Sequence, residues 1–292
     1  MIPFYSKTNV LPPSLRIPNT VQWFFKIIYF ISDRFTIYLA SKLFTTPISF
    51  KTPSRELEMA EASQKKMLHV KTINKDIHLL AYGFSDKKVL IAHGWAGRST
   101  QLFMIAHALL EKGFMVISFD APAHGKSAGK KTNLIEYIET IKAIHQEFGL
   151  FDAAIGHSFG AMALMNAQVN SPIFKCLVTV GAADKVDDIL LNFATNLGLD
   201  SNFGIKLIHY FGKKWKINLC DYDTSAAAKK VKTPAFVIHD AIDGDVSVSC
   251  AINIRQNLEK GTLFITNGLG HTKILRDKNT TQSIVNFITQ NT

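Results

Sequence analysis

Residues 152–161, DAAIGHSFGA, place a Gly-x-Ser-x-Gly motif between an apolar run and a helical pattern. Ala153, Ala154 and Ile155 predict a short buried strand, and apolar residues recur at helical spacing after Gly160. A strand, a sharp turn and a helix are the context in which this motif predicts a nucleophile elbow, with the serine on a strained backbone. Glycines on either side of the serine avoid side-chain collisions in so tight a turn. The alternative interpretation is a glycine-rich turn with an incidental serine.

Short apolar runs alternate with helical patterns on both sides of this stretch. A strand pair with a turn near Asn74 is expected over 67–82, and further strands are expected at 89–92, 116–119, 176–180, 235–238 and 263–265. Helical patterns cover 101–112, 133–148 and 283–289. The fold class is therefore α/β, with a mostly parallel central sheet flanked by helices. In such sheets the active site lies at the carboxyl ends of the strands.

Residues 184–216 interrupt this alternation with a longer apolar helical pattern. We interpret it as a small helical lid inserted over the end of the sheet. A long crossover helix is the alternative. The expected organisation is an N-terminal amphipathic helical segment and linker over 1–60, followed by the main domain over 61–292.

Residues 20–44 are rich in large apolar side chains but are interrupted by Lys26, Asp33, Arg34 and Lys42. The longest uncharged run is far shorter than the ~20 residues needed to span a bilayer, and a secretory signal is not expected. A weaker face is predicted along Gln22, Lys26, Tyr29, Asp33, Thr36 and Ala40, opposite a broad aromatic face. The pattern suits an amphipathic helix that lies on a membrane, or one that packs over an apolar groove of its own protein.

The overall composition restricts the partners and the compartment. The chain has 292 residues and a net charge of +10. Residues 1–55 contain seven basic residues and a single acidic residue, Asp33. No nucleic-acid-binding motif accompanies this charge, so an anionic surface such as lipid head groups is the expected partner of the N-terminus. Cys176, Cys220 and Cys250 match no disulfide or zinc spacing, which indicates a reducing, cytoplasmic setting with possible membrane association.

A serine becomes a nucleophile when a histidine, oriented by a carboxylate, takes its proton. The chain places Ser158, Asp243 and His271 in that order, each after a predicted strand, and we expect them to be catalytic. His124 is the second choice for the base. For the acid, Asp240 and Asp245 crowd the same loop as Asp243, and Asp184 could serve with a different geometry.

The oxyanion of such a reaction needs backbone donors. We expect them to be the N–H groups of Phe159, which follows the serine, and of Trp95, in the glycine-containing turn after an early strand. Gly125-Lys126-Ser127 resembles the end of a phosphate-binding loop, but the first glycine of that motif would fall on Asp120. No metal or cofactor is expected.

From about residue 67 onward the chain resembles the α/β-hydrolase superfamily of serine hydrolases. The matching segments are His93-Gly94-Trp95, Asp120-Ala-Pro-Ala-His124-Gly125-Lys126-Ser127, Gly156-His157-Ser158-Phe159-Gly160, His239-Asp240-Ala241-Ile242-Asp243 and Gly270-His271. The resemblance implies the α/β-hydrolase fold and the role of triad acid for Asp243. Ala123 and Asp240 stand where many members have glycine.

The expected activity is hydrolysis of a small-molecule acyl ester through an acyl-enzyme. A thioesterase, a peptidase or an acyltransferase would use the same residues, because the superfamily contains all of them. A non-catalytic protein of this fold that binds a membrane or a partner through residues 20–44 is a separate alternative. The oligomeric state is left open.

Overall fold

The computed structural model describes residues 10–292 except 12, 14–15 and 170–171, so part of the predicted N-terminal segment 1–60 lies outside the described residues. Its centre is an eight-stranded sheet in the order β1-β2-β4-β3-β5-β6-β7-β8. The strands are β1 (Gln64–Val70), β2 (Lys75–Tyr82), β3 (Lys88–Ala92), β4 (Met115–Phe119), β5 (Phe151–His157), β6 (Phe174–Val180), β7 (Ala235–Asp240) and β8 (Gly261–Thr266).

The sheet is mostly parallel, as predicted. β1 and β2 form an antiparallel hairpin that turns at Asn74, whose φ is 50°. β2 is also antiparallel to β4, and every pairing from β4 to β8 is parallel. The carboxyl ends of the parallel strands therefore meet at one edge of the sheet, where a site can form.

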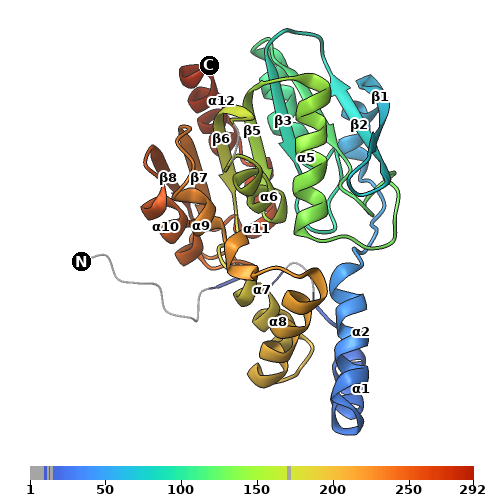
Figure 1. Ribbon diagram of the computed structural model, residues 1–292. Coiled ribbons are helices and arrows are strands. Elements are labelled where there is room, and N and C mark those ends of the chain that lie inside the picture. Colours follow the sequence, from blue (N-terminus) through green and yellow to red (C-terminus); the bar gives the residue numbers. More distant parts are fainter. Residues whose placement is uncertain (1–9, 12, 14–15, 170–171) are drawn as a thin grey trace, which may run out of the picture.

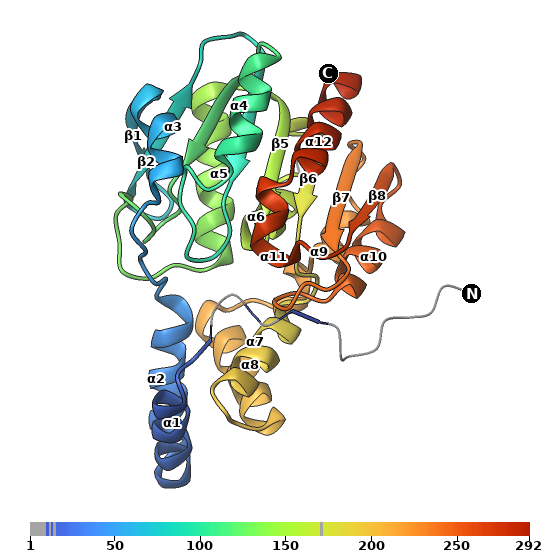
Figure 2. The same ribbon diagram turned by 180° about the vertical axis from the view of Figure 1, so that it is seen from behind.

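Helices cover both faces of the sheet (Figures 1 and 2). One face carries α5 (Leu134–Phe148), α6 (Phe159–Ala167), α9 (Thr224–Ala228) and α10 (Val248–Asn257). The other carries α3 (Leu57–Ala62), α4 (Phe103–Glu111) and α12 (Lys278–Asn291). Because successive side chains point to opposite faces of a strand, each strand contributes to the apolar core on both faces of the sheet. On β3, for example, Leu90 and Ala92 join the first layer and Val89 and Ile91 the second.

A third apolar cluster lies beyond the carboxyl end of the sheet (Figures 1 and 2). It joins α7 (Val186–Asn196) and α8 (Ser201–Trp215), which occupy the predicted lid region, to α1 (Asn19–Ile31) and α2 (Asp33–Thr45). Phe203, Leu207 and Phe211 of α8 are fully buried in it. The N-terminal helices thus pack on the α7–α8 pair and leave the sheet itself uncovered by them.

The N-terminal segment forms two helices where a single amphipathic helix was predicted. The helix breaks at Ser32, whose extended backbone (φ −159°, ψ 111°) ends α1 and whose hydroxyl accepts from the amide of Phe35 to cap α2. The predicted weak face is wrong in part, because Thr36 and Ala40 are buried while Trp23, Phe30 and Phe35 stay exposed. Within the described residues, no helix has both the length and the apolar character needed to cross a membrane.

Candidate active site

Ser158 occupies the sharp turn between β5 and α6. Its φ of 51° and ψ of −116° lie in a region that non-glycine residues rarely adopt. A Cβ on Gly156 would lie 2.5 Å from Ala161 Cα, and one on Gly160 would lie 2.4 Å from the carbonyl oxygen of His93. Both positions therefore need glycine. The start of α6 leaves no room for a side chain at 156, and the backbone at the end of β3 leaves none at 160.

The surroundings of Ser158 hold its backbone and leave its hydroxyl available. Its N–H donates to the carbonyl of Val180 at the end of β6, at 2.9 Å. Gly94 is packed so tightly beside it that an added Cβ would be 3.1 Å from Ser158 Cβ. The side chain is partly exposed, and in the described part of the chain its Oγ has no hydrogen-bond partner. The turn therefore presents an uncommitted hydroxyl at the carboxyl edge of the sheet.

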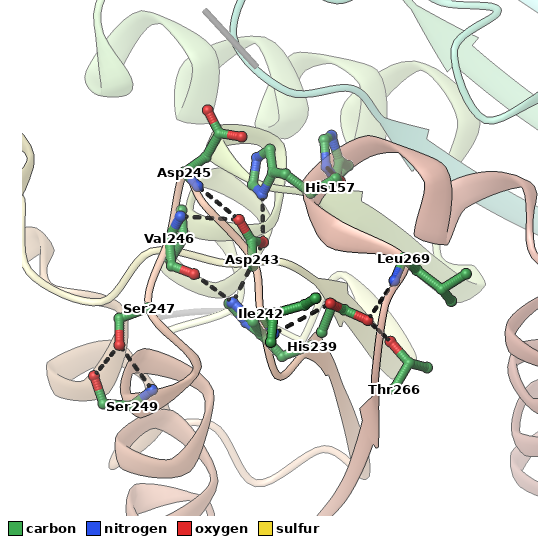
Figure 3. A network of polar contacts seen from close by, with 12 residues as sticks. His157, His239, Ile242, Asp243, Asp245, Val246, Ser247, Ser249, Thr266 and Leu269 are labelled. Atoms are coloured by element: carbon green, nitrogen blue, oxygen red, sulfur yellow. Dashed lines mark hydrogen bonds and ion pairs between the residues drawn. The ribbon is translucent and has the colours of Figure 1, made fainter. Parts of the chain in front are cut away.

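Asp243 lies in the loop after β7 and is almost fully buried. Its Oδ1 accepts the amides of Asp245 at 2.8 Å and Val246 at 3.1 Å (Figure 3). Its Oδ2 accepts from Nδ1 of His271 at 2.7 Å. Burial alone would raise the pKa of this carboxyl, but the hydrogen bond and charge of His271 outweigh it and lower the pKa. Asp243 is therefore an ionised, orienting partner for His271.

His271 lies on α11 (Gly270–Lys273), a short helix where a loop was expected. Burial alone would lower the pKa of its imidazole, but the hydrogen bond and charge of Asp243, together with the charge of Asp245, raise it above the usual value. Because Nδ1 donates to Asp243, Nε2 of the neutral ring carries the free electron pair. That nitrogen is the one that can accept a proton.

The other aspartates considered for the acid make different contacts. Asp240 accepts the amide of Leu269 at 3.0 Å and the hydroxyl of Thr266 at 2.7 Å, so it fastens the chain just before His271 to the end of β7. Asp184 accepts from the amide of Ser225 and from the side-chain amide of Asn253, which ties the loop after β6 to α9 and α10. Neither carboxylate is hydrogen-bonded to His271.

His124, the second choice for the base, has both ring nitrogens bonded to the backbone. Its Nε2 accepts the amide of Ala96 at 3.1 Å, and its Nδ1 donates to the carbonyl of Pro122 at 3.0 Å. Burial, together with the charge of His93, lowers its pKa to about 3. Because both ring nitrogens of His124 are hydrogen-bonded, the residue links the loop after β3 to the loop after β4 and has no free nitrogen for proton transfer.

The turn at Gly125-Lys126-Ser127 wraps around a carboxylate of its own chain. Asp120 accepts the amides of Lys126 at 2.9 Å and Ser99 at 2.7 Å, and a Cβ on Gly125 would be 2.3 Å from its Cγ. The amide of Lys126 is thus occupied by Asp120 and that of Ser127 donates to the carbonyl of His124, which agrees with the rejection of that motif.

The two expected oxyanion donors flank the Ser158 turn. Phe159 is the first residue of α6, where a backbone N–H has no intrahelical acceptor. Trp95 lies in the turn after β3, and its ring packs edge-on against that of Phe159, with centroids 5.4 Å apart. Among the described residues, neither amide donates a hydrogen bond to another protein group.

Three contacts of the site had no identified role in the sequence. The Nε2 of His157 donates to the carbonyl of His271 at 2.9 Å. Gly181, at φ 61°, lies so close to His271 that an added Cβ would be 3.2 Å from its ring. The amide of Leu11 donates to the carbonyl of Ile242 at 3.0 Å, beside the Asp243 loop. All three contacts join residues far apart in the chain, and only Gly181, a glycine directly after a predicted strand, carried a local signal.

Two further features of the region bear on ligands. Asp243, Asp245 and His271 offer ligand atoms within 4.8 Å of one another, a spacing compatible with a metal ion. A proton already joins Asp243 to His271, so a cation would have to displace it. A cavity of about 390 Å³ is lined by His78, Asp120 and His124 among others, and its lining includes neither Ser158 nor His271.

Comparisons with known proteins agree with this architecture. Residues 87–207 match a family model described as alpha/beta hydrolase fold. The Pyrococcus furiosus esterase Pf2001 superposes with a TM-score of 0.63 at 18% identity, covering 84% of this chain and 98% of that one. The esterase EaEST from Exiguobacterium antarcticum superposes with a TM-score of 0.62 at 17% identity, covering 77% of this chain and 100% of that one.

A structure described as a membrane phospholipase A, a bacterial virulence factor, gives a TM-score of 0.63 at 16% identity, with 81% of this chain and 89% of that chain covered. Among curated proteins, none matches the chain. The chain therefore has the α/β-hydrolase fold, and its resemblance to the α/β-hydrolase superfamily is confirmed.

Proposed function

We propose that the protein is a serine hydrolase that cleaves an acyl ester with Ser158, His271 and Asp243. The observation that carries the proposal is the 2.7 Å hydrogen bond between Asp243 and His271, made at the same edge of the sheet as the strained Ser158 turn. An orienting carboxylate, a histidine with a free Nε2 and an uncommitted serine are the three groups that acyl transfer needs.

The reaction follows from these groups. Nε2 of His271 takes the proton of Ser158 as Oγ bonds to the ester carbonyl carbon, and the amides of Phe159 and Trp95 receive the oxyanion. The bond to the alcohol then breaks, and the alcohol leaves with the proton from His271. A water molecule repeats the sequence on the acyl-enzyme, which releases the acid and restores Ser158. Asp243 orients His271 and stabilises its charged form throughout.

An apolar acyl group is the substrate that the neighbouring side chains favour. Trp95 packs against Phe159 and stacks on Phe44 of α2, with ring centroids 6.4 Å apart. Phe44 also contacts Phe193 of α7 at 5.1 Å. Aromatic rings beside the proposed oxyanion donors favour an alkyl or aryl chain over a charged group. Solved structures of the same fold that are described as esterases support the ester as the bond that is cleaved.

Chemical labelling and a graded substrate panel test the proposal. A fluorophosphonate should label Ser158, as mass spectrometry of the labelled peptide would show, and Ser158→Ala should abolish labelling. Ser201→Ala, at an exposed position on α8, is the matched control and should label as wild type does. Equal labelling of wild type and Ser158→Ala would remove Ser158 from the reaction.

The panel compares p-nitrophenyl esters of increasing chain length with a thioester and an anilide of the same acyl group. We expect the highest kcat/KM on an ester of medium or long chain. A preference for the thioester or the anilide would instead identify a thioesterase or a peptidase.

A further inference from the structure

The helices α1 and α2 bury one face and expose another of opposite character. Their buried face packs on α8, where Tyr29 meets Phe203 edge-on with ring centroids 5.1 Å apart. Lys206 of α8 also pairs with Asp33. On α2 the residues buried toward the protein are small or polar, namely Thr36, Ala40, Ser41 and Thr45. On α1 the buried residues are Phe25 and Ile28, and the other large apolar side chains of that helix are only partly buried or exposed.

The large apolar side chains lie on the other face. Phe30 is 94% exposed, Ile31 75% and Trp23 69%. Phe24, Ile27 and Phe35 are each more than half exposed, and we call these six residues the hairpin face. Trp23, Ile27, Phe30 and Ile31 line one shallow groove together with Lys26. Monomeric proteins rarely expose a contiguous apolar patch of this kind unless it binds something.

Basic residues outnumber acidic ones on the helices that carry the hairpin face. Between residues 16 and 55 the only acidic residue is Asp33, and its carboxylate is already paired with Lys206. Lys26, Arg34 and Lys42 are exposed on α1 and α2. The last turn of α8 adds Lys213 and Lys214, and no acidic residue occurs on that helix. An apolar face edged with cations complements a surface that is apolar beneath and anionic on top.

The lengths of α1 and α2 decide whether they could cross a bilayer or only lie on its surface. Each has 13 residues, which corresponds to ~20 Å and is too short to cross the ~30 Å hydrocarbon core of a bilayer. Figures 1 and 2 show α1 at the end of the molecule away from the sheet, where a flat surface can reach it. A second copy of the chain suits this face less well, because it would bring the same cations against each other.

We propose that the hairpin face docks in the plane of an anionic lipid bilayer, with Trp23, Phe30 and Ile31 inserted among the head groups. The cations of α1, α2 and α8 then contact lipid phosphates. Docking would leave the catalytic domain above the surface, with the α7–α8 pair between them. The inference rests on α1, α2 and α8 alone and does not depend on the proposed hydrolysis.

Vesicle co-sedimentation of the full chain tests the proposal. Wild type should sediment with vesicles of phosphatidylcholine and phosphatidylglycerol, much less with phosphatidylcholine alone, and less at high salt. The double variant Phe30→Ser/Ile31→Ser should lower the partition coefficient roughly 10-fold or more, because two large side chains no longer insert. Lys26→Gln/Arg34→Gln should weaken binding to the anionic vesicles and reduce the effect of salt.

Matched controls separate docking from loss of structure. Phe84 is 97% exposed in the turn between β2 and β3, so Phe84→Ser removes an equally exposed aromatic residue elsewhere and should bind as wild type does. Deletion of the two helices would be a poor test, because Phe25 and Phe44 pack in the α8 cluster. The point variants should keep the melting temperature and the hydrolysis of a soluble ester unchanged.

Three results would overturn the inference. One is wild type that stays in the supernatant with every vesicle. Another is a Phe84→Ser variant that loses as much binding as Phe30→Ser/Ile31→Ser. The third is a stable dimer, seen by light scattering, that Phe30→Ser/Ile31→Ser converts to a monomer, because the hairpin face would then bind a second copy.

Discussion

His157 Nε2 donates a hydrogen bond of 2.9 Å to the backbone carbonyl of His271. Burial, together with the charge of His271, lowers the pKa of His157 to about 3, so its ring is neutral and its single N–H is on Nε2. Its Nδ1 is buried and has no partner among the described residues. The residue before Ser158 therefore anchors the chain that carries the proposed base.

Replacing His157 should impair turnover more than substrate binding. His157→Leu removes the donor and leaves a buried carbonyl unpaired, at a cost of ~1–3 kcal/mol in the free energy of unfolding. We expect kcat to fall roughly 10- to 100-fold with little change in KM, because His271 is no longer held in place. His157→Gln keeps an N–H donor and should recover part of kcat. Equal kcat for both variants would contradict an anchoring role.

Asp243→Asn should lower kcat far more than Asp240→Asn or Asp245→Asn. Loss of a triad aspartate can cost about 10⁴ in rate, because an amide favours the wrong tautomer of the histidine. Asp184→Asn should affect the melting temperature more than the rate, since Asp184 contacts Ser225 and Asn253. Steady-state kinetics on one soluble ester would compare the four variants. If Asp184→Asn were the most damaging, the assignment of the acid would be wrong.

Activity should depend on pH through the charge of His271. The ring must be neutral to accept the proton of Ser158, and its pKa is raised by the hydrogen bond and charge of Asp243 and by the charge of Asp245, despite burial. The expected profile of kcat/KM is low in mild acid, rising through and above the ordinary histidine pKa of ~6.5 to an alkaline plateau.

The two neighbouring carboxylates should shift that profile in the same direction. Asp243→Asn removes a charge that favours imidazolium, so the rising limb of its small residual activity should move to lower pH. Asp245→Asn should produce a smaller shift of the same sign and keep most of the rate. A wild-type profile that is flat from mild acid to neutrality would contradict a histidine base.

Gly181→Ala should damage both stability and turnover. Its φ of 61° is strained for alanine, at a cost of ~1–2 kcal/mol, and the new Cβ would press on the ring of His271 at 3.2 Å. Gly113→Ala is the matched control, because Gly113 has a φ of 79° and nothing within 4 Å of an added Cβ. Both variants should lower the melting temperature, and only Gly181→Ala should lower kcat. A normal kcat for Gly181→Ala would show that His271 has room to move.

Local patterns in the sequence were sufficient for the strands, for helices α4, α5, α6 and α12, and for the turn at Ser158. Apolar runs such as Ala153 to Ile155 predict buried strands because side chains alternate along them, and the glycines at 156 and 160 predict a turn too tight for a side chain. The order of Ser158, Asp243 and His271 could also be read locally, since each follows a strand. These features depend on a few neighbouring residues.

Only the tertiary structure decided which side chains meet. Asp184, Asp240 and Asp243 look alike as residues after strands, but the pairing of β6, β7 and β8 brings Asp243 alone into a hydrogen bond with His271. His157, Gly181 and Leu11 reach the site through contacts between distant segments, which periodicity does not encode. The buried face of the N-terminal helices was predicted wrongly in part for the same reason. Helical spacing identifies an apolar face, but the contact with α8 determined that Thr36 and Ala40 became buried while Trp23 and Phe30 stayed exposed.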